Sequence, residues 1–220
     1  MTSSHAVIIL ASGLSLRLGH SKQLLSKDNQ PLTHHMSKLA LATEPKAVFI
    51  VIPQDNQEIV AAISELVTKN SNVIIIVNPT PKTGMAHSLY LAIEALKHVN
   101  LDSFIERVLI MGIDQVLLDK PHLTQLLLAK QSVVASRYTH LNEDFSVNHS
   151  KANIVGLPIT IDYKLLRQWQ SQLQGDKGLR HLIRGLADEQ VKAVINNKLS
   201  YDIDTPEQFA FAQAQGWLDS

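Results

Sequence analysis

A short loop between residues 12 and 22 carries the residue types that bind polyphosphates. Its polar and small residues include Gly13, Ser15, Arg17, Gly19 and Lys22. Glycines let backbone amides approach phosphate oxygens, whereas an arginine can bind two oxygens at once and a lysine supplies a movable charge. No acidic residue occurs before this loop or within it, so no neighbouring carboxylate in the sequence competes for the two cations. The loop therefore predicts a polyphosphate site.

The spacing of the glycines distinguishes this loop from two better-known phosphate loops. Five residues separate Gly13 from Gly19, and two more precede Lys22. A Walker loop needs four residues between its glycines and a lysine directly after the second. The dinucleotide pattern needs a second glycine where this chain has Ser15. The sequence therefore indicates neither a P-loop NTPase nor a nicotinamide-dependent enzyme.

Two aspartates that follow or precede structured segments are candidate magnesium ligands. Asp114 ends an apolar run that is typical of a buried strand. Asp204 precedes Thr205 at the expected start of a helix, so it is also a candidate helix cap. Asp202 would share a face with Asp204 in an extended segment. Mg²⁺ in nucleotidyl transfer needs only one or two carboxylates besides substrate phosphates, so Asp114 and Asp204 are predicted to be its ligands.

Alternating strands and helices must position these groups. Apolar runs rich in β-branched residues predict strands at Ala6–Ala11, Val48–Ile52, Val73–Val77, Val108–Met111, Val133–Ser136 and Val191–Ile195. Helical spacing predicts helices at Thr33–Ala42, Asn56–Thr68, Ala86–His98, Lys120–Ala129, Asp162–Leu173, Gly178–Gly185 and Thr205–Gln215. This alternation predicts an α/β fold with a mostly parallel sheet that helices cover on both faces. Ligands of such sheets bind at the carboxyl ends of the strands.

Two polar segments interrupt the alternation. Residues Asp28–Pro31 indicate a turn, and Tyr138–Pro158 is polar and rich in turn-forming residues. We expect one domain over residues 1–220, with an antiparallel excursion around residues 138–159.

The composition limits the classes of partner and cofactor. The 20 basic residues balance the 20 acidic ones, which gives no electrostatic footprint for nucleic acid or an anionic membrane. The absence of cysteine excludes a disulfide, a thiolate zinc site and a cysteine nucleophile. The ten histidines form no metal-binding motif, and no serine-hydrolase elbow occurs. No run has membrane-spanning length and no signal-peptide pattern is present, so we expect a cytoplasmic protein.

Residues Leu10–Lys22 resemble the signature of the MobA-like nucleotidyltransferases. The family pattern is Leu-Ala-Ala/Gly-Gly-x-Ser-x-Arg-Met-Gly-x-x-Lys, and every glycine and polar anchor is in register here. Ser12 occupies the position of alanine or glycine, which leaves the choice of base open. The resemblance implies catalytic roles for Arg17, Lys22 and Asp114. It also implies nucleotide binding by Leu10, Ala11, Ser12, Gly13, Ser15, Arg17 and Lys22.

Later segments resemble further elements of the family. Asp114-Gln115 resembles its Asp-Gln-Pro motif with Val116 in place of proline, and residues 202–207 resemble its Asp-Ile-Asp-Thr-Pro-Glu ending. Gly84–Leu89 resembles the Gly-Met-x-x-Ser-Leu motif of the cytidylyltransferase branch, whereas the Gly-Pro-Leu-Ala-Gly segment of the guanylyltransferase branch is absent. This likeness implies that Gly84 and Ser88 bind nucleotide. Two more segments resemble acceptor-side elements, which implies acceptor contacts at Gly156, Pro158, Lys177 and Arg180.

The resemblance implies a Rossmann-like three-layer α/β/α sandwich of the nucleotide-diphospho-sugar transferase type. It further implies that Mg²⁺ assists the transfer of CMP from CTP to a molybdopterin-type cofactor with release of pyrophosphate. A molybdoenzyme or a maturation factor is the implied protein partner. Guanylyl transfer to molybdopterin and cytidylyl transfer to another phosphorylated small molecule remain alternatives. A nucleotide-binding accessory protein without turnover is a further alternative from another class.

Overall fold

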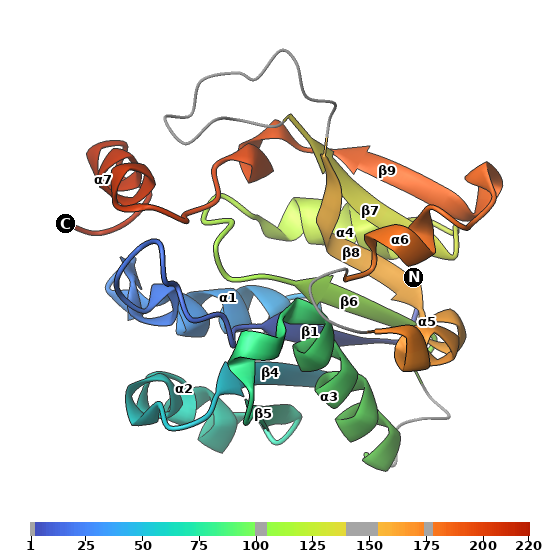
Figure 1. Ribbon diagram of the computed structural model, residues 1–220, viewed down its shortest axis with the longest axis horizontal. Helices are drawn as coiled ribbons and strands as arrows, with labels where there is room; N and C mark the ends of the chain where they lie inside the picture. The colour runs from blue at the N-terminus through green and yellow to red at the C-terminus, as the bar shows by residue number, and fades with distance from the viewer. Residues whose placement is uncertain (1–2, 100–104, 140–153, 174–177) are drawn as a thin grey trace.

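A central sheet of seven strands organises the computed structural model, which describes residues 3–99, 105–139, 154–173 and 178–220 (Figure 1). Its strands lie in the order β5 (Val73–Asn78), β4 (Ala47–Pro53), β1 (His5–Leu10), β6 (Arg107–Met111), β8 (Ile154–Asp162), β7 (Val133–Tyr138) and β9 (Val191–Ile195). The first four strands are mutually parallel, and β9 is parallel to β7. Only β8 runs antiparallel to its neighbours in the described sheet. The mostly parallel α/β fold predicted from the sequence is therefore confirmed.

Strand β8 is the element that the sequence pattern hides. Its segment contains Gly156 and Pro158, which interrupt an otherwise apolar strand pattern. The pairing of β7 with β8 also shifts register between Ala135 and Ser136. The excursion expected around residues 138–159 falls largely on residues 140–153, which lie outside the described ranges.

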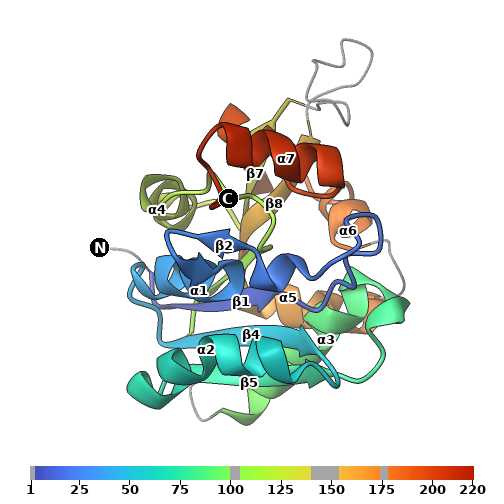
Figure 2. The same ribbon diagram turned by 90° about the vertical axis from the view of Figure 1, so that its left-hand side faces the viewer.

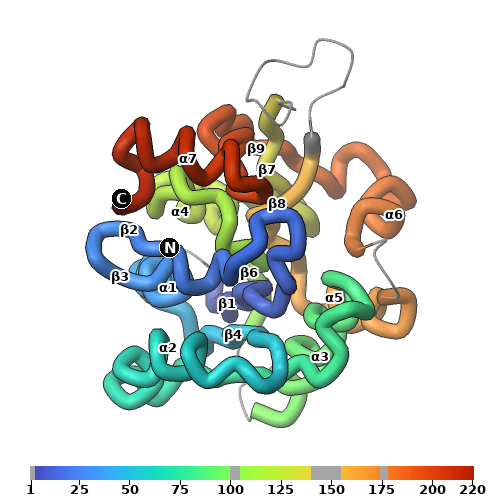
Figure 3. Tube along the Cα trace, turned by 60° about the vertical axis from the view of Figure 1, so that its left-hand side comes forward, coloured from blue at the N-terminus to red at the C-terminus, as the bar shows by residue number. Residues whose placement is uncertain are grey.

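Helices cover both faces of the sheet, as the continuous apolar runs of β1, β4 and β6 require. They are α1 (Leu32–Leu41), α2 (Gln57–Lys69), α3 (Met85–His98), α4 (Lys120–Leu128), α5 (Tyr163–Trp169), α6 (Arg180–Ile183) and α7 (Pro206–Ala214). Side chains of successive strand residues point to opposite faces, so Val7 and Ile9 pack with α1, α2 and α4, whereas Ala6 and Ile8 pack with α3 and α5. Figure 3 shows these two helical layers on either side of the strands. The three-layer sandwich is confirmed.

Shorter elements complete the frame of the site. They are the 3-10 turns η1 (Lys22–Leu24), η2 (Pro81–Thr83), η4 (Gln170–Gln172), η5 (Asp188–Gln190) and η6 (Asn197–Ser200), and the hairpin of β2 (Ser26–Lys27) and β3 (Gln30–Pro31). The predicted turn at Asp28–Pro31 is thus confirmed, whereas the predicted helix Asp162–Leu173 is divided between α5 and η4. Figure 2 shows α7 beside the hairpin that follows η1. Among the described helices, none is long and apolar enough to cross a bilayer.

Candidate active site

The glycine-bracketed loop leaves the sheet at the carboxyl end of β1. The amide of Ala11 still donates to the carbonyl of Val51 at 2.9 Å, after which the chain turns away from the strands. The buried amide group of Gln23 donates to the carbonyls of Ala11 and Gly13, at 2.7 and 2.8 Å. Within the described part of the chain, the backbone amides of residues 12–17 donate no hydrogen bond. They are therefore available to an anion at this strand end.

Ser15 supports the shape of the loop through its own side chain. Its backbone adopts a left-handed conformation with φ of 52°, and its carbonyl accepts the amide of Gly19 at 3.1 Å. Its hydroxyl oxygen accepts the amide of Lys22 at 3.2 Å. Because that bond uses only the oxygen, the hydroxyl proton of Ser15 can still be donated to a phosphate.

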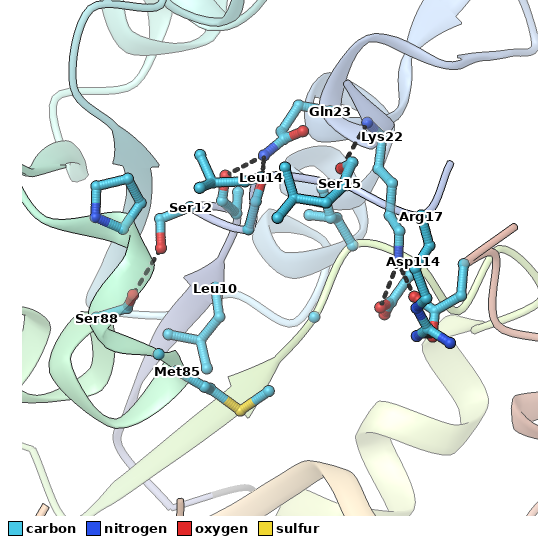
Figure 4. Close-up of a pocket in the computed structure, with 18 of the residues that line it drawn as sticks. Leu10, Ser12, Leu14, Ser15, Arg17, Lys22, Gln23, Met85, Ser88 and Asp114 are labelled. Atoms are coloured by element: carbon cyan, nitrogen blue, oxygen red, sulfur yellow. Dashed lines mark hydrogen bonds and ion pairs between the residues drawn. The ribbon is translucent and has the colours of Figure 1, made fainter. Parts of the chain in front are cut away.

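Four charged side chains from three distant parts of the sequence meet beside this loop (Figure 4). The ammonium of Lys22 pairs with Asp204 and lies 3.4 Å from Oδ2 of Asp114. Asp204 also pairs with the guanidinium of Arg17. The side chain of Lys22 is 12% exposed, whereas that of Arg17 is 62% exposed. The cluster therefore has a buried and a solvent-facing cation.

The charges of this cluster stabilise one another. Burial disfavours the charged form of Lys22, but the carboxylates of Asp114 and Asp204 outweigh burial and raise the pKa of Lys22. Burial likewise opposes ionisation of Asp204, but Lys22 and Arg17 outweigh it and lower the pKa of Asp204. Both partners are thus held in their charged forms at neutral pH.

The carboxylates of Asp114 and Asp204 approach the same ammonium because the chain after η6 lies against the end of β6. The amide of Ile203 donates to the carbonyl of Asp114 at 3.1 Å, and Asp202 forms an antiparallel bridge with Gln115. Gly112 leaves room for the carboxylate, because a Cβ there would lie 2.9 Å from Oδ1 of Asp114. A larger residue at position 112 would displace this side chain.

The start of α7 fixes Asp204. Thr205 caps the helix by accepting the amide of Gln208 at 3.3 Å, and the side chain of Gln208 accepts the amides of Asp204 and Thr205 at 2.7 and 3.1 Å. This reciprocal pattern is a capping box. Because Thr205 caps the helix, the carboxylate of Asp204 is left to pair with cations. This arrangement differs from the alternative in which Asp204 is only a cap.

A pocket of about 580 Å³ brings together the residues that were predicted to bind nucleotide and metal. Every one of them lines it: Leu10, Ala11, Ser12, Gly13, Ser15, Arg17, Lys22, Gly84, Ser88, Asp114 and Asp204. We call this space the donor pocket. The turn before α3 also lines the donor pocket, and Gly84 in this turn has φ of 95° and ψ of 176°. That conformation is available to glycine almost alone.

Buried hydroxyls form one end of the donor pocket. The hydroxyl of Ser12 lies 2.6 Å from that of Ser88, and Asn78 donates to Ser88 at 3.0 Å. All three residues are at most 5% exposed. One hydroxyl proton is used between the two serines, so the other is free for a ligand.

A second pocket of about 290 Å³ adjoins the first one and shares Leu10, Met85, Asp114 and Leu157 with it. We call it the acceptor-side pocket. Gly156 and Arg180 line it, as their predicted roles require. Pro158 lies buried in β8, where its carbonyl accepts the hydroxyl of Ser136 at 2.6 Å, and does not line this pocket. Lys177 lies outside the described residues.

Asp202 lines the acceptor-side pocket, whereas Asp204 lines the donor pocket. Burial and repulsion by Asp114 and Asp204 raise the pKa of Asp202 to about 7. Burial, with the nearby charges of Asp202 and Asp114, also raises the pKa of Tyr138 in the same pocket to about 12. The two acids of the Asp-Ile-Asp segment therefore face different spaces and different charges.

Sequence analysis did not identify several residues that shape the site. Gln23 holds the loop and Asn78 holds Ser88, but a single buried amide side chain has no distinctive spacing in a sequence. Gln115 appeared only as part of a motif, and Tyr138 lay at the edge of the segment that was hardest to interpret. Both line the acceptor-side pocket.

The carboxylates of the site suit Mg²⁺ when substrate phosphates supply its remaining ligands. Among the described residues, no group of three or more His, Asp, Glu or Cys side chains could hold a metal ion by itself. Asp114 and Asp204 instead approach the same ammonium and provide carboxylate oxygens only. Mg²⁺ is commonly bound by one or two carboxylates together with substrate phosphates.

Comparisons with solved structures show a shared fold. The crystal structure of Rv0371c from Mycobacterium tuberculosis H37Rv is 18% identical with a TM-score of 0.71, covering 97% of this chain and 100% of that chain. Rv0371C from the same organism in complex with manganese is 17% identical with a TM-score of 0.66, covering 95% and 97%. A 4-diphosphocytidyl-2C-methyl-D-erythritolsynthase from Anaerococcus prevotii DSM 20548 is 19% identical with a TM-score of 0.66, covering 97% and 96%.

The sequence itself identifies the family. A comparison with curated proteins finds no match. The model of the MobA-like NTP transferase domain, however, matches residues 7–192, which include the loop and Asp114. The chain therefore belongs to the MobA-like NTP transferase family.

Proposed function

We propose that this protein transfers CMP from CTP to a phosphorylated acceptor, a molybdopterin-type cofactor, and releases pyrophosphate. The observation that carries the proposal is the position of Asp114. Its carboxylate pairs with Lys22 beside the loop, and the residue lines both the donor and the acceptor-side pockets. A nucleotide in one pocket and an acceptor in the other would meet there.

The reaction needs no protein nucleophile. A phosphate oxygen of the acceptor, already ionised near neutral pH, forms a bond to the α-phosphorus of CTP. The bond from that phosphorus to the bridging oxygen breaks, and the electron pair leaves with pyrophosphate. Positioning and charge stabilisation then supply the rate enhancement. The amides of residues 12–17, with Arg17 and Lys22, would bind the triphosphate and stabilise the charge that develops on the leaving group.

Asp114 and Asp204 would hold Mg²⁺, which when bound supplies positive charge at the triphosphate. Support comes from their shared contact with Lys22 and from the manganese complex of the similar Rv0371C. In the structure, the ammonium of Lys22 approaches both of these carboxylates. We infer that Lys22 turns toward the phosphates when nucleotide enters, because the phosphates offer it a stronger anionic partner.

The base would bind beside Gly84, Ser12 and Ser88. Gly84 admits a ligand close to its backbone, and the hydroxyl pair has one proton free for a carbonyl such as that of cytosine. The likeness of residues 84–89 to the cytidylyltransferase motif favours CTP over GTP.

The acceptor would occupy the acceptor-side pocket. Leu89, Ile110, Val155 and Ile159 give its wall an apolar character, while Arg180 supplies a cation. Such a wall, with the polar side chains of Gln115, Tyr138 and Asp202 beside it, suits a polar ring system that carries a phosphate.

Pyrophosphate release with CTP, GTP, ATP and UTP, each with and without molybdopterin cofactor, tests the proposal. We expect release with CTP only when the cofactor is present. Release with GTP instead would indicate a guanylyltransferase, and release with CTP and methylerythritol phosphate would indicate the reaction named for the Anaerococcus prevotii protein. Tight CTP binding without release from any acceptor would indicate an accessory protein. Each of these results would overturn the proposed reaction.

A further inference from the structure

We propose that Asp219 is a positioning residue that fixes the hairpin after Lys22 to the segment after α7 and thereby holds Lys22 against Asp204. The activity readout of this proposal rests on the proposed nucleotidyl transfer, whereas its metal-binding readout does not. The proposal follows from contacts that lie outside both pockets.

Asp219 makes an unusually complete set of hydrogen bonds to the turn between β2 and β3. Its carboxylate accepts the amides of Asp28 and Asn29 at 3.2 and 2.8 Å, and the hydroxyl of Ser26 at 2.5 Å. Its own amide donates to the carbonyl of Ser26 at 2.9 Å. These bonds also lower the pKa of Asp219, with the bond from Ser26 as the largest cause.

The turn that Asp219 binds needs support. Asp28 and Asn29 both have positive φ, 54° and 59°, in the region that non-glycine residues rarely occupy. Their two amides point to the same side and reach one carboxylate. Asp219 therefore stabilises the turn in this shape and ties it to the chain after α7.

Further contacts hold the hairpin and the chain after α7 together. Lys27 donates to the carbonyl of Trp217 at 3.2 Å, and Gln213 of α7 donates to the carbonyl of Asp219 at 2.7 Å. Leu218 is buried in the same core as α1 and α2. Figures 2 and 3 place this segment beside β2. The segment anchors itself through Leu218, and Asp219 then fixes the hairpin on it.

The hairpin and α7 each lead directly to a charged residue of the donor pocket. The hairpin begins after η1, which contains Lys22, and α7 begins directly after the Asp204–Thr205 cap. The ion pair between Lys22 and Asp204 is thus a second connection between the same two segments. Disturbance of the Asp219 contacts therefore moves one partner of that ion pair relative to the other.

The test compares Asp219→Ala with Asp219→Asn, which keeps one carbonyl oxygen for the turn. We expect Asp219→Ala to lower kcat at least tenfold, since small misplacements of a catalytic group have effects of that size or larger, with a smaller change in KM for CTP. Binding of Mn²⁺ without nucleotide should become tighter, because a displaced Lys22 no longer competes for the carboxylate of Asp204. The kcat of Asp219→Asn should lie between that of the wild type and that of Asp219→Ala.

Two matched variants separate positioning from general destabilisation. Ile63→Val trims a buried side chain of α2 and Glu189→Ala removes an exposed carboxylate, and both should keep the metal dependence of the wild type. A wild-type kcat and metal dependence in Asp219→Ala would overturn the proposal.

If the wild type releases no pyrophosphate at all, the proposed function fails instead. The affinity for Mn²⁺ in the absence of nucleotide then decides the role of Asp219: tighter binding in Asp219→Ala supports it, and equal or weaker binding rejects it.

Discussion

The ammonium of Lys22 pairs with the carboxylate of Asp204, although the two residues lie 182 positions apart in the chain. The same ammonium lies 3.4 Å from Asp114. Two candidate metal ligands thus share one lysine. The positive charge keeps the carboxylates close together, and it also competes with any cation that would bind between them.

This competition predicts that metal and nucleotide bind cooperatively. Removal of the charge in Lys22→Met should tighten binding of Mn²⁺ alone by about tenfold, or about 1.4 kcal/mol, because a like charge no longer occupies the site. Binding of CTP should weaken, since a charge-assisted contact worth about 1.5–3 kcal/mol is lost. Electron paramagnetic resonance and calorimetric titration would measure the two affinities. Lys69→Met on α2 serves as the control, and weaker binding of Mn²⁺ alone in Lys22→Met would contradict the interpretation.

Much of the fold was predictable because the central strands β1, β4 and β6 are buried on both faces. The run predicted as Ala6–Ala11 forms β1 at His5–Leu10, and the other parallel strands agree equally well. Strand β8 escaped prediction, since Gly156 and Pro158 remove the apolar pattern that identifies a strand. The predicted helix from Asp162 was too long because residues 170–172 tighten into a 3-10 turn.

The site was predictable where one short segment carries several chemical groups, as in the loop with Arg17 and Lys22. Contacts across the sheet were not predictable, because pairing depends on how close the folded chain brings the partners. Ser12 gave no sign that its hydroxyl would meet Ser88, and nothing in the pattern placed Asp202 in a different pocket from Asp204.

Replacing Gly13 and Gly112 by alanine should change different kinetic constants. A Cβ at Gly13 meets no atom within 4 Å, so Gly13→Ala should preserve stability but place a methyl group in the donor pocket. A Cβ at Gly112 meets the carboxylate of Asp114 at 2.9 Å. We expect Gly13→Ala to raise KM for CTP and Gly112→Ala to lower kcat and Mn²⁺ affinity. Steady-state kinetics with thermal melting would measure both, and an identical pattern in the two variants would refute the assignment.

The roles of the acids can be separated by replacing each with asparagine. Asp114→Asn and Asp204→Asn should each lower turnover by orders of magnitude, because each removes charge from the proposed metal site. The double variant should lose much less than the product of the two losses, since ligands of one metal act as a unit. Asp202→Asn should alter mainly the KM for the acceptor, as Asp202 lines the other pocket. Normal turnover in Asp204→Asn, or strictly multiplicative losses, would show that the two acids do not share a metal.

Two buried histidines, His122 and His5, predict a contribution to stability that is lost below about pH 6.5. His122 is 4% exposed and its Nε2 lies 2.8 Å from the hydroxyl of Ser136. Because Ser136 donates its own proton to the carbonyl of Pro158, His122 must be the donor in that contact. Burial lowers the pKa of His122, against a weaker opposing effect of Asp119, and burial also lowers the pKa of His5.

The sign follows from proton linkage. The unfolded chain binds protons at these histidines at higher pH than the folded chain does, so their contribution to stability is complete above the unfolded pKa of about 6.5 and falls as the pH drops toward the lower folded pKa. Asp202 acts in the opposite direction over part of this range, because its folded pKa of about 7 lies above its unfolded value. Both proteins contain Asp202, so its contribution cancels when the pH dependence of His122→Gln is compared with that of the wild type. We expect the free energy of unfolding, measured in urea at pH 7.5 and pH 5, to decrease less in His122→Gln than in the wild type. Equal decreases in the two proteins would mean that His122 titrates normally when the protein is folded.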